Sequence, residues 1–173
     1  LLPTRGIEGM NQFSVYFDDV KVSADDLVGE EHAGAQAMFN SLNPERILGG
    51  AAAAGLVDHL LRVSCEYARN RRVFRDTPIG AYQGIAHPLA EIRIELEALR
   101  MLVHRAAWAF DRGLPPQEVG TLANMAKYKG GELAVQAADR AIQTHGGSGF
   151  SEDVGIIYHW DSARLLRTAP ITK

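Results

Sequence analysis

The stretch ELAVQAADRAIQTHGGSGF, residues 132–150, decides the fold of this chain. A helical run with alanines, a leucine and a valine on its inner face stops at two glycines, Gly146 and Gly147. Glycine readily adopts the left-handed backbone that ends a helix, so the pair predicts a helix end followed by a loop. The glycines also leave main-chain amides open to a ligand that carries phosphate or ribose. Taken alone, the two glycines favour a helix end with a loop over a ligand site. The motifs elsewhere in the chain decide between these two interpretations.

Two more long helices are expected before residue 132. The middle of the chain repeats apolar residues at steps of three or four, at Ile85, Leu89, Ile92, Leu96, Leu99, Leu102, Ala106 and Phe110. This spacing predicts one amphipathic helix that ends at Gly113. Pro116 opens the next helix, because proline is favoured in a first turn. Its expected core residues are Val119, Leu122, Met125, Leu133 and Ala137.

The first helix is expected over residues 35–69. Its predicted core stripe is Met38, Leu42, Leu48, Leu56, Leu60, Val63 and Tyr67. Pro44 has no backbone donor, so we expect a kink or a break near Asn43. The small run GGAAAAG, residues 49–55, predicts close approach of another helix or of a flat ligand.

A shorter helix, roughly residues 154–167, should turn Ile157, Trp160 and Leu165 inward. Short connections between long helices indicate antiparallel neighbours. The fold expected for residues 34–173 is therefore an all-α, up-down four-helix bundle.

Residues 1–33 have a different pattern. Phe13, Val15 and Phe17 alternate with polar or half-polar residues, which predicts a strand, and residues 20–22 predict a second extended piece. Two short strands do not form an independently stable sheet. We therefore expect this segment to be the end of a β domain with its linker, and the chain, which begins without Met, to be part of a longer protein.

Composition excludes several classes of function. The chain has 173 residues, 46% of them hydrophobic, and a formal net charge of −3, so it offers no basic field for nucleic acid. No uninterrupted apolar run reaches about twenty residues, and we expect no membrane partner. The single cysteine, Cys65, fits a spacer in a helix and a reducing compartment, either cytoplasm or mitochondrial matrix. The six histidines lack metal-ligand spacing, so no metal is expected.

Three sites could carry chemistry. In YARNRRVF, residues 67–74, arginines crowd a helix end, where they could be a solvated cap or a pyrophosphate site; Gln83 follows at a helix start. Glu45 is a surface glutamate by its residue type, but the apolar run beside it could raise its pKa and make it a proton acceptor. SARLLRT, residues 162–168, is a basic helix end that runs into Pro170.

Together these stretches resemble the C-terminal part of an acyl-CoA dehydrogenase. FDDVKVSADDLVGEEHAG, residues 17–34, resembles the end of the family's central β domain. YARNRRVF with Gln83 resembles the family's Arg-x-x-Phe with a downstream Gln, and QTHGGSGF resembles its Gln-x-x-Gly-Gly-x-Gly-Phe loop. DSARLLR resembles the stretch before the usual catalytic glutamate. Each motif is weak alone, but four in this order and spacing are specific.

The resemblance implies FAD as cofactor and an acyl-CoA substrate, with electron-transfer flavoprotein as electron acceptor. It implies a homodimer or homotetramer in which FAD lies at subunit junctions. The residues that match the family's FAD contacts are Arg71, Phe74, Gln83, Gln143, Gly146, Gly147 and Thr172. Asn43 and Arg46 match the pair that flanks the acyl thioester.

Two positions depart from the family. Where its common base stands in a Tyr-Glu-Gly-Thr run, this chain reads Ala-Pro-Ile-Thr, and Pro170 can accept no proton. Some members place the base on the first bundle helix instead, and Glu45 occupies that place. One extra residue between Phe74 and Gln83 weakens the assignment of Gln83.

The expected reaction is α,β-dehydrogenation of an acyl-CoA thioester, with Glu45 as base. The chain by itself should be inactive and colourless. The alternatives are an acyl-CoA or nitroalkane oxidase, and a catalytically silent subunit that completes a partner's flavin site. A plain helical interaction module fits the glycine loop and the arginine cluster poorly.

Overall fold

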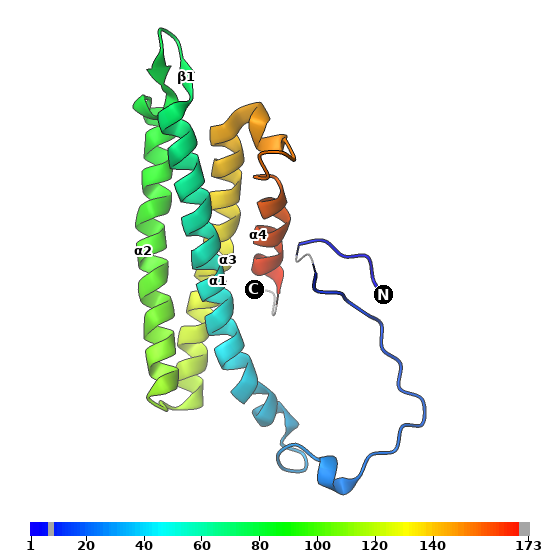
Figure 1. Ribbon diagram of the computed structural model, residues 1–173. Coiled ribbons are helices and arrows are strands. Elements are labelled where there is room, and N and C mark those ends of the chain that lie inside the picture. Colours follow the sequence, from blue (N-terminus) through cyan, green and yellow to red (C-terminus); the bar gives the residue numbers. More distant parts are fainter. Residues whose placement is uncertain (7–8, 170–173) are drawn as a thin grey trace.

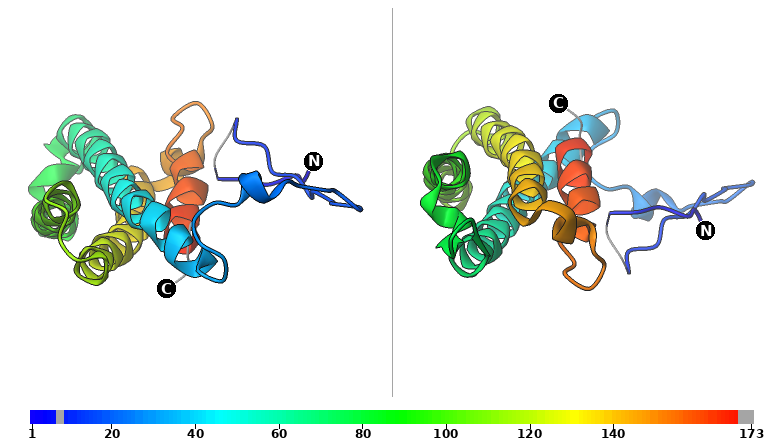
Figure 2. Two further views of the ribbon diagram at one scale, coloured as in Figure 1. Left: turned by 90° about the horizontal axis from the view of Figure 1, so that it is seen from below. Right: turned by 90° about the horizontal axis from the view of Figure 1, so that it is seen from above.

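The computed structural model describes residues 1–6 and 9–169, except for the side chains of Gln36 and Asn40. Four helices run up and down (Figure 1): α1 (Gly34–Asn70), α2 (Gln83–Asp111), α3 (Pro116–His145) and the shorter α4 (Tyr158–Thr168). Viewed end-on, α2 and α4 lie on opposite sides of α1 and α3 (Figure 2), and α3 packs against each of the other three helices. The predicted all-α, four-helix architecture is confirmed.

The apolar stripe of α2 forms one side of the core. Leu89, Ile92, Leu96 and Leu99 are all buried, as their spacing predicts. Leu96 and Leu99 are fully enclosed together with Leu60 of α1 and Leu133 of α3. Because this stripe is covered only when helices pack on it, these residues fix the place of α2 in the bundle.

The buried face of α1 differs from the predicted stripe. Leu48 is 68% exposed, Met38 is also exposed, and the buried positions include Ile47, Ala53 and Val57. The reason is that α1 and α3 meet through small residues. A Cβ added to Gly50 would lie 3.1 Å from the Ala126 carbonyl carbon and oxygen, and one added to Gly130 would lie 3.0 Å from the Ala53 Cβ.

The close approach expected of GGAAAAG is therefore present, and it buries small side chains in place of Leu48. Met125 of α3 was predicted as core and is exposed as well. Leu48 and Met125 are therefore left exposed, while glycine and alanine make the closest contact between the two helices.

Pro44 does not break the first helix. Helix α1 continues without interruption from Gly34 to Asn70. The neighbouring Asn43 side chain donates from Nδ2 to the Pro116 carbonyl of α3 at 3.2 Å, and Ile47 one turn later is buried. Packing of this turn on α3 offsets the single hydrogen bond that proline removes, so a break near Asn43 is wrong, and the alternative of a kink there stays a prediction.

The connector after α1 contains a small hairpin that the sequence analysis did not predict. Strand β1 (Arg72–Val73) pairs antiparallel with β2 (Thr77–Pro78), and a 3₁₀ turn, Ile79–Ala81, leads into α2. Three consecutive turn residues, Phe74, Arg75 and Asp76, have positive φ of 36°, 61° and 65°. None is glycine, so the turn carries no ordinary sequence signature.

The N-terminal segment does not form the predicted strands. In residues 9–33 the structure has one 3₁₀ turn, Ala24–Asp26, and its only β pairing is an isolated bridge between Leu2 and Gln12. Phe13, Val15 and Phe17 are exposed. A strand needs a neighbouring backbone to pair with, and the described residues supply none here.

Residues 1–6 nevertheless contact the bundle. The Arg5 guanidinium lies 2.7 Å from the Asp161 carboxylate, and the Ser162 hydroxyl donates to the Gly6 carbonyl at 2.7 Å. Both partners are on α4, which begins four residues later than predicted. Ile156 before it is buried and the half-buried Trp160 packs on the core, as a helix end against the bundle requires.

By length and composition alone, Ala37–Asn70 of α1 could cross a membrane. Asp58 and Arg62 interrupt its apolar residues, which is why the sequence shows no long uninterrupted run. Its most apolar window is 44% buried inside the bundle. A core helix meets the same criteria, and α1 packs along both α2 and α3.

Candidate functional site

A hollow of about 480 Å³ lies at the hairpin end of the bundle, between the end of α1 and the end of α3. Its lining consists of Tyr67, Arg71, Val73, Phe74, Ile79, Tyr82, Ile85, Gln143, Thr144, His145, Gly146, Gly147 and Ser148. We call it the glycine hollow. Five of the seven predicted FAD contacts, separated by up to 76 residues in the chain, meet in it: Arg71, Phe74, Gln143, Gly146 and Gly147.

Arg71 is held by its own backbone at the start of the hairpin. Its N–H donates to the Tyr67 carbonyl at 2.8 Å, and its carbonyl accepts from the Ile79 N–H at 2.8 Å. The side chain is exposed. The fold therefore fixes the backbone of Arg71 and leaves its guanidinium accessible to a ligand.

Phe74 stands at the tip of the hairpin and is 82% exposed. Its φ of +36° is uncommon for a bulky residue, so the turn holds the ring out of the core at a cost in backbone energy. An aromatic ring presented to solvent beside a cationic side chain suits a flat, anionic ligand.

The glycines end α3 as predicted. Gly146 has φ 58° and ψ −136°, and its N–H donates to the Gln143 carbonyl. A Cβ added to Gly146 or Gly147 would meet nothing within 4 Å, so this side of the loop is open. Gly149, in contrast, has no space: its Cβ would lie 2.8 Å from the Ile142 carbonyl oxygen. The 3₁₀ turn Gly146–Phe150 is thus folded back on α3 with its first two glycines uncovered.

Tyr67 and His145 form the floor of the hollow, and the sequence analysis did not identify them as site residues. Their ring centroids are 4.3 Å apart. His145 is buried, and its Nδ1 lies 2.8 Å from the Ala141 carbonyl, so Nδ1 carries the hydrogen and donates it. Both residues stand inside the quoted motifs, and that position was the available signal.

The remaining two predicted contacts are Gln83 and Thr172. Gln83 is the first residue of α2 and is exposed, but its neighbour Tyr82 lines the hollow and Gln83 does not. Thr172 lies outside the described residues. The role of each stays a prediction.

Asn43 and Arg46 meet in a second hollow, of about 560 Å³, between α1 and the start of α3. Arg46 is only 7% exposed, and its Nη1 donates to Asn43 Oδ1 at 3.3 Å. The guanidinium carbon also lies 5.9 Å from the centroid of the Phe39 ring. These contacts hold the cation in one place, in the manner of a group that binds a fixed polar atom.

Glu45, the predicted base, is exposed and does not line either hollow. Its neighbours Ile47 and Gly50 are buried toward α3 and leave the Glu45 side chain uncovered. Pro170 lies outside the described residues.

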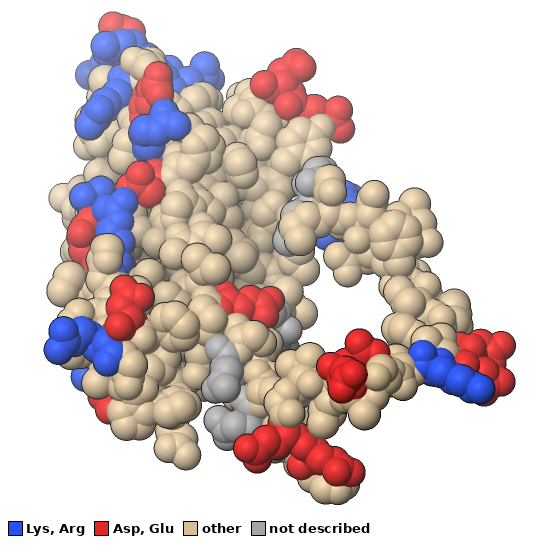
Figure 3. Space-filling model, turned by 60° about the horizontal axis from the view of Figure 1, so that its bottom comes forward, with Lys and Arg blue, Asp and Glu red and all other residues tan. Residues whose placement is uncertain are grey.

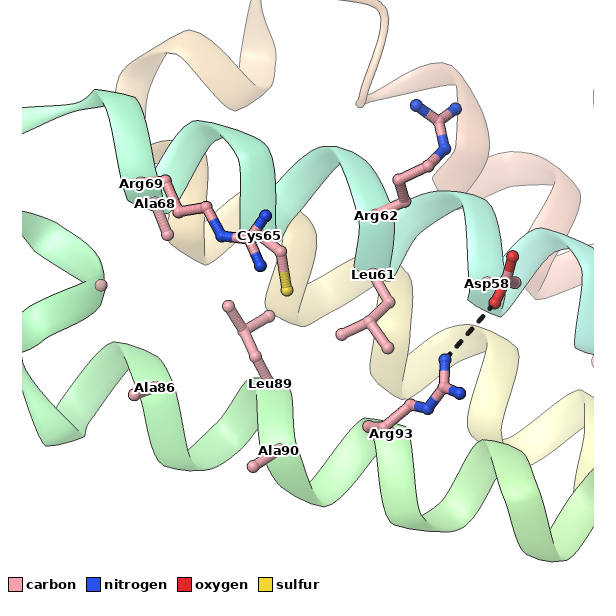
Figure 4. A pocket seen from close by; sticks show the side chains of 11 residues that line it. Asp58, Leu61, Arg62, Cys65, Ala68, Arg69, Ala86, Leu89, Ala90 and Arg93 are labelled. Atoms are coloured by element: carbon pink, nitrogen blue, oxygen red, sulfur yellow. Dashed lines mark ion pairs between the residues drawn. The ribbon is translucent and has the colours of Figure 1, made fainter.

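A third hollow, of about 620 Å³, lies between α1 and α2 (Figure 4). Its floor includes Leu61 and Leu89, and the half-buried Cys65 is the small spacer that the sequence predicts. Arg93 at its edge lies 3.9 Å from the Asp58 carboxylate. None of the predicted site residues that the structure describes lines it. Arg69, although close to Arg71 in sequence, belongs to this hollow.

Charge is unevenly distributed over the surface. Lysine and arginine side chains gather at the hairpin end of the bundle (Figure 3). The end of α1 and the hairpin that follows it contain Arg69, Arg71, Arg72 and Arg75. Among residues 1–6 and 9–169, no three His, Cys, Asp or Glu side chains group as metal ligands. The glycine hollow therefore combines one guanidinium, that of Arg71, with an uncovered glycine backbone and an exposed aromatic ring.

The chain is similar to known proteins over nearly its whole length. The model of the family "Acyl-CoA dehydrogenase, C-terminal domain" matches residues 32–170. The acyl-CoA dehydrogenase FadE12 of Mycobacterium tuberculosis is 43% identical over 164 residues, which are 94% of this chain and 41% of that protein. The chain thus spans about two fifths of this relative's length.

Solved structures agree with the sequence relatives. Butyryl-CoA dehydrogenase of Megasphaera elsdenii superposes with a TM-score of 0.84 at 31% identity, over 90% of this chain and 40% of that one. The FAD complex of PigA gives 0.83 at 28% identity, over 90% and 40%. From the matched family model, these likenesses and the shared motifs, it follows that this chain belongs to the acyl-CoA dehydrogenase family, as a C-terminal helical domain of that family.

Proposed function

We propose that the protein catalyses FAD-dependent α,β-dehydrogenation of an acyl-CoA thioester. The observation that carries this proposal is the glycine hollow, where Arg71, Phe74, Gln143 and the two open glycines converge from two distant motifs. The family supports an oxidoreductase that acts on acyl-CoA. The substrate class, the cofactor and the residue roles below are our inference.

The residues of the glycine hollow fit FAD. The Arg71 guanidinium is suited to a pyrophosphate, because its planar fork matches two phosphate oxygens. A ligand can approach the backbone at Gly146 and Gly147 closely, since a Cβ at either position would meet nothing within 4 Å. FAD held there would supply the redox chemistry, as the acceptor of the hydride that leaves the substrate β-carbon.

The exposure of Phe74 favours an oligomer. An 82% exposed ring held by a strained turn has little to contact within its own chain. We infer a homodimer or homotetramer in which this hairpin reaches the FAD of a neighbouring subunit. Residues 1–33 would then be the end of a β domain that completes the site, and electron-transfer flavoprotein would accept the electrons.

Asn43 and Arg46 would bind the thioester end of the substrate. Asn43 fixes the Arg46 guanidinium before any ligand arrives, so little reorganisation is needed when the carbonyl oxygen gains negative charge. Glu45, adjacent in sequence, would remove the α-proton. Its exposed carboxylate needs a substrate and further protein to cover it, since a general base must lie within hydrogen-bond reach of its proton.

The test uses the complete protein, purified with its flavin. Anaerobic titration with a panel of acyl-CoA thioesters should bleach the oxidised flavin spectrum for at least one chain length. An unchanged spectrum with every thioester would overturn the proposal and leave the silent-subunit alternative. Oxygen uptake during turnover would identify an oxidase instead. Residues 1–173 expressed alone should purify colourless, because they hold only part of the proposed flavin site.

A further inference from the structure

His145, at the end of α3, is a buried histidine to which the proposed function gives no task. Only 6% of the residue is exposed, although it lines the glycine hollow. It is the last residue of α3 and stands directly before the uncovered Gly146. A ligand that approaches the glycine backbone therefore comes close to this ring.

Two contacts hold the His145 ring in one orientation. Its Nδ1 lies 2.8 Å from the Ala141 carbonyl, one turn earlier in α3, and so carries a hydrogen that it donates. The ring also lies against the Tyr67 ring, with centroids 4.3 Å apart and an interplanar angle of 31°. A hydrogen bond at one edge and an aromatic ring at one face leave the imidazole little freedom to turn. Its second nitrogen, Nε2, therefore also has a fixed direction.

The His145 ring is neutral in this setting. An imidazolium ion taken out of water needs a counter-charge, and the ion pairs of the described residues do not include His145. In a neutral imidazole whose Nδ1 carries the hydrogen, Nε2 has none and can only accept a hydrogen bond. The acceptor character of Nε2 thus follows from the bond that Nδ1 makes to Ala141.

Nε2 is not used within the part of the chain that the structure describes. The bond from Nδ1 is the hydrogen bond that this ring makes among residues 1–6 and 9–169. Ser64 Oγ is the single enclosed polar side-chain atom of these residues with neither a partner nor contact with solvent. Nε2 has no partner and is not such an atom, so it keeps a narrow opening to solvent. Since His145 lines the glycine hollow and is otherwise buried, Nε2 opens into this hollow.

The hollow therefore offers two complementary groups to one ligand. The Arg71 guanidinium has donors only, which suit the oxygens of a pyrophosphate. Nε2 of His145 accepts only, so it disfavours a phosphate oxygen and favours an O–H donor. In FAD the pyrophosphate lies between two hydroxylated chains, the ribose of the adenosine half and the ribityl chain of the flavin half. A hydroxyl near the pyrophosphate is the group that would satisfy His145 while Arg71 binds phosphate.

We propose that His145 is a cofactor-binding residue, which accepts a hydrogen bond at Nε2 from a sugar hydroxyl of FAD. The inference rests on the function proposed above, in which FAD binds in the glycine hollow. The bond to Ala141 and the Tyr67 ring orient the acceptor before the ligand arrives, so little freedom is lost on binding. The contact adds a preference for a hydroxylated chain beside the pyrophosphate, which Arg71 alone does not provide.

Three substitutions in the complete protein separate Nε2 from the two contacts that hold the ring. His145→Phe keeps a ring against Tyr67 and loses both nitrogens. His145→Asn keeps an amide donor near the position of Nδ1 and loses the ring. Nε2 is the one feature that both variants lack. His145→Gln places an amide oxygen near the position of Nε2, and His104→Asn, at an exposed site of α2, is the matched control.

The measurement is the FAD dissociation constant of the apoprotein, with the unfolding midpoint of each variant beside it. His145→Phe and His145→Asn should bind FAD about three- to tenfold more weakly, as expected for one neutral hydrogen bond. His145→Gln should recover most of the affinity, and His104→Asn should match wild type. A loss in only one of His145→Phe and His145→Asn would assign the effect to the Ala141 bond or to the Tyr67 contact, and would overturn the proposal.

Deoxy analogues of FAD identify the hydroxyl. Each lacks one hydroxyl, either of the adenosine ribose or of the ribityl chain. The analogue without the accepted hydroxyl should bind wild type about three- to tenfold more weakly than FAD does. In His145→Phe the same analogue and FAD should bind equally, because the acceptor is gone. If every deoxy analogue binds wild type like FAD, the proposal is overturned even where no variant folds.

The outcomes separate this inference from the proposed function. If wild type binds FAD and no acyl-CoA reduces it, the proposed reaction fails, and the FAD affinities still decide the role of His145. If wild type reacts while His145→Phe and His145→Asn bind FAD like wild type, this inference alone is overturned. A complete wild-type protein that binds no FAD would overturn both.

Discussion

The rings of Tyr67 and His145 lie 4.3 Å apart, at an interplanar angle of 31°. Tyr67 precedes Arg71 by one helical turn at the end of α1, and His145 is the last residue of α3 before Gly146. The contact therefore joins the two segments that line the glycine hollow, the end of α1 and the end of α3. It keeps the arginine beside the open glycines, which a shared anionic ligand requires.

Replacement of Arg71 by alanine should weaken FAD binding in the complete protein. A charge-assisted bidentate contact with a phosphate contributes about 1.5–3 kcal/mol, so the flavin affinity should fall about ten- to hundredfold. The measurement is the FAD dissociation constant after removal and titration of the flavin. Arg69→Ala is the control, because Arg69 lies two residues away and lines a different hollow. If Arg71→Ala binds FAD as tightly as Arg69→Ala does, the arginine cluster is a solvated helix end and not a pyrophosphate site.

Two glycines of α1 should respond to alanine in opposite directions. Gly50→Ala places a Cβ 3.1 Å from the Ala126 backbone and should destabilise the domain by about 1–3 kcal/mol through overpacking. Gly55→Ala meets nothing within 4 Å and should stabilise α1 by about 0.5–1 kcal/mol, because alanine loses less backbone entropy in a helix. Denaturant unfolding measures both. A loss of stability in Gly55→Ala would mean that this face of α1 is covered in the complete protein.

The size of the residues in the helix contacts explains why the buried face of α2 was predicted correctly and that of α1 was not. In α2 the core residues are large and regularly spaced, so Ile92, Leu96 and Leu99 identify the buried face directly. In α1 the contact with α3 is made by glycine and alanine. A search for large apolar residues therefore selected Leu48, which is exposed.

The candidate site was predicted in part for a similar reason. The resemblance to the family's motifs selected Arg71, Gln143 and the glycines, and these residues do line one hollow. It did not identify Tyr67 or His145, whose importance comes from a ring contact between two helices. The hairpin after α1 was missed because its left-handed turn residues are Phe, Arg and Asp, with no glycine to signal it.

Acid should weaken the packing of α4 on α1 through His159. Its ring is half-buried against His59, with centroids 5.0 Å apart, and Arg62 Nη2 lies 3.2 Å from His59 Nδ1. Burial, and then the charge of His59, lower the pKa of His159. Below the ordinary histidine pKa of about 6.5 the unfolded chain therefore binds a proton that the folded chain does not, and the free energy of unfolding falls as pH falls.

The comparison is the unfolding midpoint at about pH 7.5 and about pH 5.5, on either side of that value, in wild type and His159→Gln. The variant should lose less stability on acidification than wild type. His87→Gln, at an exposed position of α2, controls for the loss of one histidine. If His159→Gln loses as much stability as wild type between the two pH values, the His59–His159 contact is not a source of acid sensitivity.

Glu45→Gln tests the assignment of the base. Pro170 cannot accept a proton, and removal of the substrate α-proton still requires a basic group. Glu45 lies between Pro44 and Arg46 on α1, next to the Asn43–Arg46 pair that is held in place before a ligand binds. Glutamine keeps the size and polarity of the side chain and removes its basicity. The variant should retain FAD, fold and acyl-CoA binding, and reduce flavin at least about a hundredfold more slowly, the low end for loss of a general base.

Glu66→Gln, at an exposed site of the same helix, should react like wild type. Flavin reduction at the wild-type rate in Glu45→Gln would show that another group takes the proton. Glu45 would then be an ordinary surface residue of α1.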